Sequence, residues 1–520
     1  LMYHIPLVDQ WLRVGGLYAP DCEVWYNPSN NELLALWCAA PFSGDFLIGL
    51  ASLPGAALLA LGTIETARAL GLRAASAHLA GLAAVSNFVV LRQVVDSEND
   101  VAAAGAFMAA LAYSLRHARD GRLADLALAS AALGLLAGVK YYAIGYAAVA
   151  WTALVTVTWL SRGGRGAARA AIAGLVGILL LAGYWYLRNA WLTGLPLYPR
   201  GVSPANDPLA EIRPGVWTST LLGNGRPEVV PLLIESVRKS LGAAHLVACA
   251  MAPTAAAWLC LGGLLRKGPS PKARLVVALT LLAALANWSV IPFCVETTPG
   301  SMNMLRGAYL PARFGLCVLT LAVVSFVVLL DDLQGKLRGR VAVALAGRRS
   351  QARWPHPTVR VGTAYAPHLL FAGLALSQLA PTPFRHLPCN RLDALLVGVN
   401  LGLAATMIGS AANLWRSSSS AAWWAPISIA ACSLGIGWLG ERWHAGYAPF
   451  YDEFFHTKLF SELAEKPPSE TRLCACTYRY YPFLGSHRQF RVSRPLWVPT
   501  YESLLAYLDR HDATLVLRGV

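Results

Sequence analysis

The chain has 520 residues, of which 56% are hydrophobic and 14% are charged, against about 25% charged residues in ordinary soluble domains. This composition excludes an ordinary soluble enzyme, a disordered chain and, with ten cysteines over this length, a disulfide-dense scaffold. The net charge of +15 is typical of a polytopic membrane protein whose Lys and Arg residues keep its loops cytoplasmic, and we expect no nucleic-acid partner.

Apolar runs long enough to cross a bilayer, about 20 residues each, recur along the chain. We expect residues 1–44 to lie outside the membrane as an external loop of the catalytic type. Twelve spans are then predicted within residues 45–440, at 45–63, 75–91, 101–115, 123–138, 141–160, 170–187, 241–265, 275–293, 309–330, 365–380, 392–412 and 422–440. The runs 101–115 and 365–380 are short, which favours tilted or partly re-entrant segments.

The distribution of Lys and Arg orients these spans. One alternating set of loops carries 20 Lys and Arg in 79 residues, and the other carries 11 in 90. The positive-inside rule makes the first set cytoplasmic. Residues 1–44, the loop 188–240 and the polar tail 441–520 then lie outside, where long aromatic loops indicate the functional face.

The tail 441–520 is predicted to form a small extracytoplasmic α/β domain. Strand-like runs occupy 472–477, 490–492 and 514–517, and a helical stretch occupies 501–508. The predicted fold class is therefore mainly α: a transmembrane helical bundle with a small α/β C-terminal domain.

Three carboxylates stand within five residues in the second external turn, at Asp96, Glu98 and Asp100. Placing a charge at the edge of a span costs free energy unless the charge is paired or in contact with water, so these residues are candidates for function. Asp96 and Asp100 are candidate ligands of a divalent cation such as Mg²⁺ or Mn²⁺, and all three are candidate catalytic acids or bases. The alternative is that Asp100 caps the next helix while the others face water.

Further candidates lie in the first external segment. Tyr3, His4 and Glu32 carry polar side chains near its two ends. We predict a catalytic role for His4, with a polar surface residue as the alternative. Glu32 is a candidate for the acceptor site, or a first-turn carboxylate that complements a helix dipole.

Four cations at the external ends of spans oppose the positive-inside trend: Lys140, Arg188, Arg306 and Arg313. An anionic ligand explains their position, because guanidinium groups bind phosphate with two hydrogen bonds and lysine binds it as a point charge. The alternative for each one separately is snorkelling to lipid headgroups. The chain has no phosphate-binding loop, serine-hydrolase elbow or zinc-protease motif.

Ordered motifs resemble the GT-C class of integral-membrane glycosyltransferases, which includes protein mannosyltransferases that use dolichyl-phosphate mannose and the aminoarabinose transferase acting on lipid A. The resemblance covers nearly the whole chain and rests on residues 3–6, 27–34, 99–104, 138–141, 186–189, 194–199, 306–311 and 481–485. Individually these motifs are loose, and their order gives the resemblance its specificity.

The resemblance implies a polyprenyl-phosphate-linked sugar as donor and a glycan, lipid or protein as acceptor, at the outer face of a bacterial inner membrane. Asp100 matches the second-loop acid, which binds metal or shapes the acceptor site. Lys140, Arg188 and Arg306 match residues that hold the donor phosphate, and Tyr198 lies in a matching external loop.

The chain departs from the family pattern at one point. The catalytic aspartate usually stands a few residues before the Tyr3-His4 pair, which here falls upstream of Leu1. We expect the mature protein to extend upstream with this acid and a thirteenth span, or else Asp9 or Asp21 substitutes for it. A transporter or flippase of lipid-linked saccharide, and a noncatalytic subunit of a membrane complex, remain as alternatives.

Overall fold

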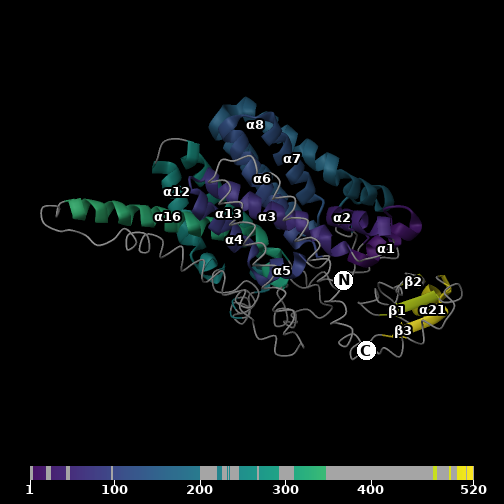
Figure 1. The fold of residues 1–520 in the computed structure, drawn as a ribbon. Helices are drawn as coiled ribbons and strands as arrows, with labels where there is room; N and C mark the ends of the chain where they lie inside the picture. Colours follow the sequence, from purple (N-terminus) through teal and green to yellow (C-terminus); the bar gives the residue numbers. More distant parts are fainter. Residues whose placement is uncertain are drawn as a thin grey trace.

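The computed structural model describes residues 4–18, 25–42, 47–94, 98–198, 220–224, 231, 234, 245–265, 269–291, 310–346, 472–476, 491–493, 501–510 and 512–518. These residues are mainly helical, as predicted (Figure 1). Among them, four helices are long and apolar enough to cross a membrane: Leu50–Ala69, Tyr141–Thr193, Ser270–Ser289 and Leu316–Gln334. The predicted spans 365–380, 392–412 and 422–440 lie outside the described residues.

The segment that the sequence predicts to be the first external one contains helices α1 (His4–Val14) and α2 (Asn30–Ala39), followed by the 3-10 turns η1 (Ala40–Phe42) and η2 (Ile48–Ser52). Apolar side chains of α1 and α2 form their own core, in which Trp11 stacks on Trp185 with ring centroids 5.9 Å apart. Burying an aromatic ring removes a large apolar area from water. The segment is therefore a packed helical unit attached to the bundle.

Helices α3 (Leu53–Ala69), α4 (Ala74–Val85), α5 (Phe88–Val94), α6 (Asp100–Asp120) and α7 (Leu123–Ala137) follow. The sequence predicts one span over 75–91, and this expectation is wrong, because the segment breaks between α4 and α5. Asn87 causes the break: its Oδ1 accepts a hydrogen bond of 3.0 Å from the main-chain N of Val90. An asparagine that caps a new first turn satisfies amides left open where the preceding helix ends.

Helix α8 (Tyr141–Thr193) contains both predicted spans 141–160 and 170–187. Its backbone leaves the helical conformation at Gly163, with φ 72° and ψ −174°. Only glycine adopts this region without a steric penalty, so Gly163 makes the turn between the two halves. The second half packs closely on α7, where a Cβ added to Gly134 would lie 2.1 Å from the carbonyl oxygen of Gly177.

The described bundle is completed by α10 (Leu221–Asn224), α12 (Ala252–Leu265), α13 (Pro269–Ser289), α15 (Leu310–Phe314) and α16 (Leu316–Ala346). Figure 1 shows α6 inside the bundle, and most of its side chains are buried. Asp332 of α16 forms an ion pair with Arg274 of α13 and accepts a 2.9 Å hydrogen bond from Nε1 of Trp258. These contacts connect three helices at the end of the bundle opposite the N-terminus of α6.

Near the C-terminus, the described residues form strands β1 (Arg472–Cys476), β2 (Arg491–Ser493) and β3 (Leu515–Arg518) and helix α21 (Tyr501–Arg510). The strands form a parallel sheet in the order β2-β1-β3, in which Leu473 pairs with both Val492 and Leu515. These elements match the strand and helix positions predicted from the sequence. The domain boundaries remain predictions.

Candidate functional site

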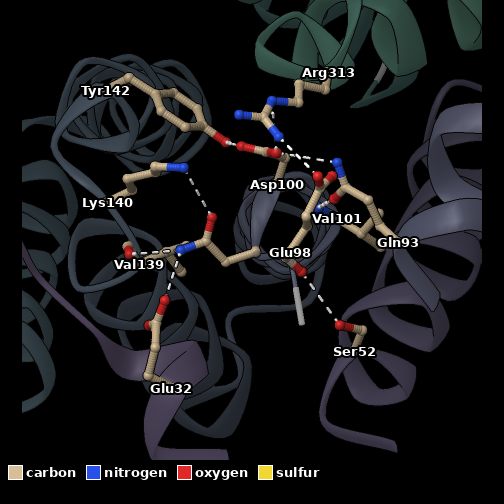
Figure 2. Close-up of polar contacts among 11 residues, drawn as sticks. Glu32, Ser52, Gln93, Glu98, Asp100, Val101, Val139, Lys140, Tyr142 and Arg313 are labelled. Carbon is tan, nitrogen blue, oxygen red and sulfur yellow. Dashed lines mark hydrogen bonds and ion pairs between the residues drawn. The ribbon is translucent and has the colours of Figure 1, made fainter. Parts of the chain in front are cut away.

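Polar side chains from several helices and from the turn η2 meet at the N-terminus of α6 (Figure 2). Asp100 is the first residue of this helix and is 1% exposed. The N-cap position belongs to Asn99, so the expectation that Asp100 caps the helix is wrong. A carboxylate in the first turn still complements the positive end of the helix dipole.

Both carboxylate oxygens of Asp100 accept hydrogen bonds. The hydroxyl of Tyr142 donates to Oδ1 over 2.8 Å, and Nε2 of Gln93 donates to Oδ2 over 3.0 Å. The other amide atom of Gln93, Oε1, accepts from the main-chain N of Val101 over 2.9 Å. Gln93 thereby satisfies an open first-turn amide of α6 and holds Asp100 at the same time.

Arg313 of α15 links the two described acids of the second turn. Its Nη1 lies 3.0 Å from Oε1 of Glu98, and its Nε lies 3.4 Å from Oδ2 of Asp100. The guanidinium carbon also lies 4.9 Å from the ring centre of Phe314. A cation between two carboxylates, here with a side chain 15% exposed, compensates charge that the low-polarity interior would otherwise penalise.

Lys140, the residue before α8, brings a second cation to the same place. Its Nζ donates to Oδ1 of Asn99 over 3.4 Å and lies 5.7 Å from the ring centre of Phe314 and 6.0 Å from that of Tyr142. Cations are attracted to the faces of aromatic rings, most strongly where water is excluded. The two cations therefore lie beside the same aromatic ring, on either side of the acidic turn.

The first external segment reaches this group through Glu32. Its Oε1 accepts from Nδ2 of Asn99 over 3.1 Å and is hydrogen-bonded to Nδ1 of His4. His4 is 5% exposed, so the surface alternative for this residue is wrong. Burial raises the pKa of Glu32 to about 7, and burial together with the Lys140 charge holds the pKa of His4 well below its usual value.

Arg188 and Tyr198 belong to a neighbouring aromatic group. Nη2 of Arg188 donates to the carbonyl oxygen of Trp25 over 2.6 Å, and its guanidinium lies 5.4 Å from the Trp25 ring. Tyr198 stacks on the same ring with centroids 5.8 Å apart. Tyr141 connects this group to the site, because its hydroxyl donates to the carbonyl oxygen of Tyr198 over 2.6 Å.

The structure brings together six predicted site residues: His4, Glu32, Glu98, Asp100, Lys140 and Arg313. Tyr3, Asp96 and Arg306 lie outside the described residues. Sequence reasoning missed Gln93, Asn99 and Tyr142, of which only Asn99 adjoins predicted residues. Amide and phenol groups have no characteristic spacing that marks a site, so adjacency to Glu98 and Asp100 is the one signal, and it singles out Asn99 alone.

The described side chains do not form the predicted divalent-cation site. Both oxygens of Asp100 are engaged by Tyr142, Gln93 and Arg313, and the second predicted ligand, Asp96, is not described. Within the described ranges, no group of three or more His, Cys, Asp or Glu side chains is arranged to hold a metal ion. Hard cations such as Mg²⁺ need several oxygen ligands. Because the second predicted ligand is not among the described residues, a metal role for Asp100 remains a prediction.

Comparison with solved structures identifies the fold. The chain is similar to the crystal structure of ArnT from Cupriavidus metallidurans bound to undecaprenyl phosphate, with a TM-score of 0.52 and 13% identity over 99% of this chain and 84% of that one. It is also similar to ArnT from the same organism in the apo state, with a TM-score of 0.51 and 14% identity over 100% and 84%. No protein-family model and no curated protein matches the chain.

At this identity the likeness concerns the fold. It spans practically the whole chain, and it confirms the fold that the resemblance to GT-C enzymes implied, a mainly helical multi-pass membrane protein.

Proposed function

We propose that this protein is an integral-membrane glycosyltransferase that moves a sugar from a polyprenyl-phosphate donor to an acceptor on the extracytoplasmic face of a bacterial inner membrane. The observation that carries the proposal is the meeting of two carboxylates, Glu98 and Asp100, with two cations, Lys140 and Arg313, at one end of an ArnT-like bundle. Substitution at a sugar carbon bonded to phosphate requires both kinds of group.

The reaction that we assign to the site is substitution at the anomeric carbon. The acceptor hydroxyl gives its proton to a carboxylate while its oxygen bonds to that carbon. The bond from the carbon to the phosphate oxygen breaks, and the departing polyprenyl phosphate keeps the electron pair. Preorganised cations stabilise that leaving group more strongly in a site that excludes water than they would in solution.

The two carboxylates differ in a way that divides their roles in this proposal. The side chain of Asp100 is fully buried and is fixed by two hydrogen bonds and the ion pair with Arg313, whereas the side chain of Glu98 is 11% exposed. We assign Asp100 to holding Arg313 and Glu98 to meeting the acceptor hydroxyl. A donor phosphate that replaces Glu98 as partner of Arg313 would free the Glu98 carboxylate to accept the proton.

Lys140 and Arg313 are the proposed phosphate ligands within the described group. Arg188 and Arg306 are also proposed phosphate ligands. Arg188 belongs to the neighbouring aromatic group. Tyr3, Glu32 and Tyr198 remain proposed contributors to the acceptor loop. The sugar is not specified by any contact, and the acceptor stays open between a glycan, a lipid and a protein.

The first experiment measures lipid binding by the purified protein in detergent. Undecaprenyl phosphate should bind saturably, and undecaprenol, which lacks the phosphate, should not. Lys140→Met should weaken binding by on the order of tenfold or more, the usual effect of losing a charge-assisted contact. Lys272→Met is the matched control, because Nζ of Lys272 donates to the carbonyl of Leu160 on another part of the bundle. Equal binding of both lipids would contradict the proposal.

A second experiment tests the transfer itself. Radiolabelled polyprenyl-phosphate sugars are supplied to membranes that contain the protein, and label is followed into lipid, glycan and protein fractions. The proposal expects label in one of these fractions and its loss with Glu98→Gln. Movement of the intact lipid-linked sugar across the bilayer without transfer would favour the transporter alternative.

A further inference from the structure

Asn99 connects the first external segment to the cations of the site. It is 1% exposed and stands between the acids Glu98 and Asp100 in sequence. Its Nδ2 donates to Oε1 of Glu32 over 3.1 Å and lies 3.4 Å from the carbonyl oxygen of Val139, while its Oδ1 accepts from Nζ of Lys140 (Figure 2). One buried amide therefore contacts three separate segments.

The chemistry of these partners fixes which way the amide points. A flipped amide would set its NH₂ group against the Lys140 ammonium, donor against donor. It would also set its oxygen against the Glu32 carboxylate and the Val139 carbonyl, acceptor against acceptor. Because an ammonium only donates and the Val139 carbonyl only accepts, the oxygen of Asn99 must face Lys140.

Holding Lys140 in advance matters for a phosphate ligand. A lysine side chain loses rotamer entropy when it is fixed, and a ligand that must fix it is bound more weakly for that reason. The rings of Tyr142 and Phe314 attract the ammonium without giving it one direction. The oxygen of Asn99 supplies that direction.

We propose that Asn99 is a positioning residue for the donor phosphate: Glu32 and Val139 orient its amide, and the amide holds the Lys140 ammonium ready to receive the phosphate. This inference rests on the proposed function, in which Lys140 is a phosphate ligand. It assigns Glu32 a part in donor binding that acts through Asn99, across the boundary between the first external segment and the bundle.

The test compares two substitutions with opposite steric and electrostatic effects. Asn99→Ala removes the oxygen and leaves a cavity, and it should weaken undecaprenyl phosphate binding by on the order of tenfold. Asn99→Asp keeps the shape but adds a negative charge that pairs with Lys140 and repels the phosphate. It should therefore weaken binding more than Asn99→Ala does. A purely structural residue would lower the thermal stability of both variants and leave the lipid affinity of the folded protein unchanged.

A double-mutant cycle with Lys140→Met shows whether Asn99 acts through Lys140. The double variant should bind undecaprenyl phosphate no more weakly than Lys140→Met alone. Asn87→Ala is the matched control: Asn87 is equally buried, and it forms hydrogen bonds with the main chain of Ala84 and Val90. It should lower thermal stability and leave lipid affinity within about twofold. Losses that simply multiply in the double variant would overturn the proposal.

The same proteins give a readout that needs no lipid. The shifts in thermal unfolding midpoint for Asn99→Ala and Lys140→Met should be smaller in combination than their sum, because both remove one shared contact. Additive shifts would show that Asn99 does not hold Lys140 and would overturn the inference. Coupled shifts in a protein that fails to bind undecaprenyl phosphate would instead refute the proposed function, and with it the role of Asn99 toward a donor.

Discussion

The hydroxyl of Tyr142 donates a 2.8 Å hydrogen bond to Oδ1 of Asp100, 42 residues earlier in the chain. This contact joins the first turn of α8 to the first residue of α6, and Arg313 joins α15 to the same carboxylate. Three helix ends are thereby fixed around one buried charge. The geometry of the proposed site depends on that charge.

Asp100→Asn should abolish sugar transfer while the protein stays folded. The substitution keeps the size of the side chain but removes the charge that holds Arg313, and it places an NH₂ group against the donors of Tyr142, Gln93 or Arg313. Radiolabel transfer measures the effect, and circular dichroism with thermal unfolding reports on the fold. Asp120→Asn is the control, because Asp120 pairs with Arg119 at the far end of α6. Undiminished turnover would reject this role of Asp100.

Tyr142→Phe should lower kcat/KM for transfer by about tenfold, the effect of one hydrogen bond to a charged group. The ring that faces Lys140 is retained, so undecaprenyl phosphate binding should change less than turnover does. Tyr113→Phe, in the middle of α6, is the matched control. A loss confined to lipid affinity would show that the Tyr142 hydroxyl acts on the donor site rather than through Asp100.

Glu32 should make stability dependent on pH. Its pKa in the folded protein is raised to about 7 by burial, above its ordinary value of 4.5, so its contribution is fully present below pH 4.5 and is lost as the pH rises through 7. The charged or titratable groups that act on it are His4 on α1, Lys140 before α8 and Asp100 on α6.

We therefore expect Glu32→Gln to gain stability relative to the wild type as the pH rises from 4.5 to 7, by about 3 kcal/mol in total for a shift of that size. The difference should stay constant above that range. Thermal unfolding of both proteins in detergent between pH 4.5 and 8.5 measures it. A difference that does not change with pH would contradict the prediction.

Asp332→Ala should destabilise the protein by about 3–5 kcal/mol, because it leaves the Arg274 guanidinium, 5% exposed, without its ion-pair partner. Arg274→Met in the same background should recover much of the loss, since an apolar side chain has no charge to compensate. Thermal unfolding midpoints test both. These residues lie away from the proposed site, so undecaprenyl phosphate binding by the folded fraction should be unchanged.

The helical fold and most of its elements could be predicted from the sequence, because hydropathy and charge are local properties. The strands and helix near the C-terminus match their predicted positions within a few residues. The span predicted over 75–91 failed at Asn87, where one polar cap outweighs a run of apolar neighbours. A window average does not register a single side chain that ends one helix and begins another.

The sequence by itself determined that the chain belongs in a membrane. It also selected Asp100, Lys140 and Arg313 as functional candidates, because charged residues at the ends of spans are energetically costly. Only the tertiary structure decided that these charges share one place, and that Gln93, Asn99 and Tyr142 hold them there. The physical reason is that the position of a charged residue within an apolar span, which is visible in the sequence, already indicates that burying its charge is costly. The partner that offsets this cost comes from helices tens to hundreds of residues away, and packing alone selects it.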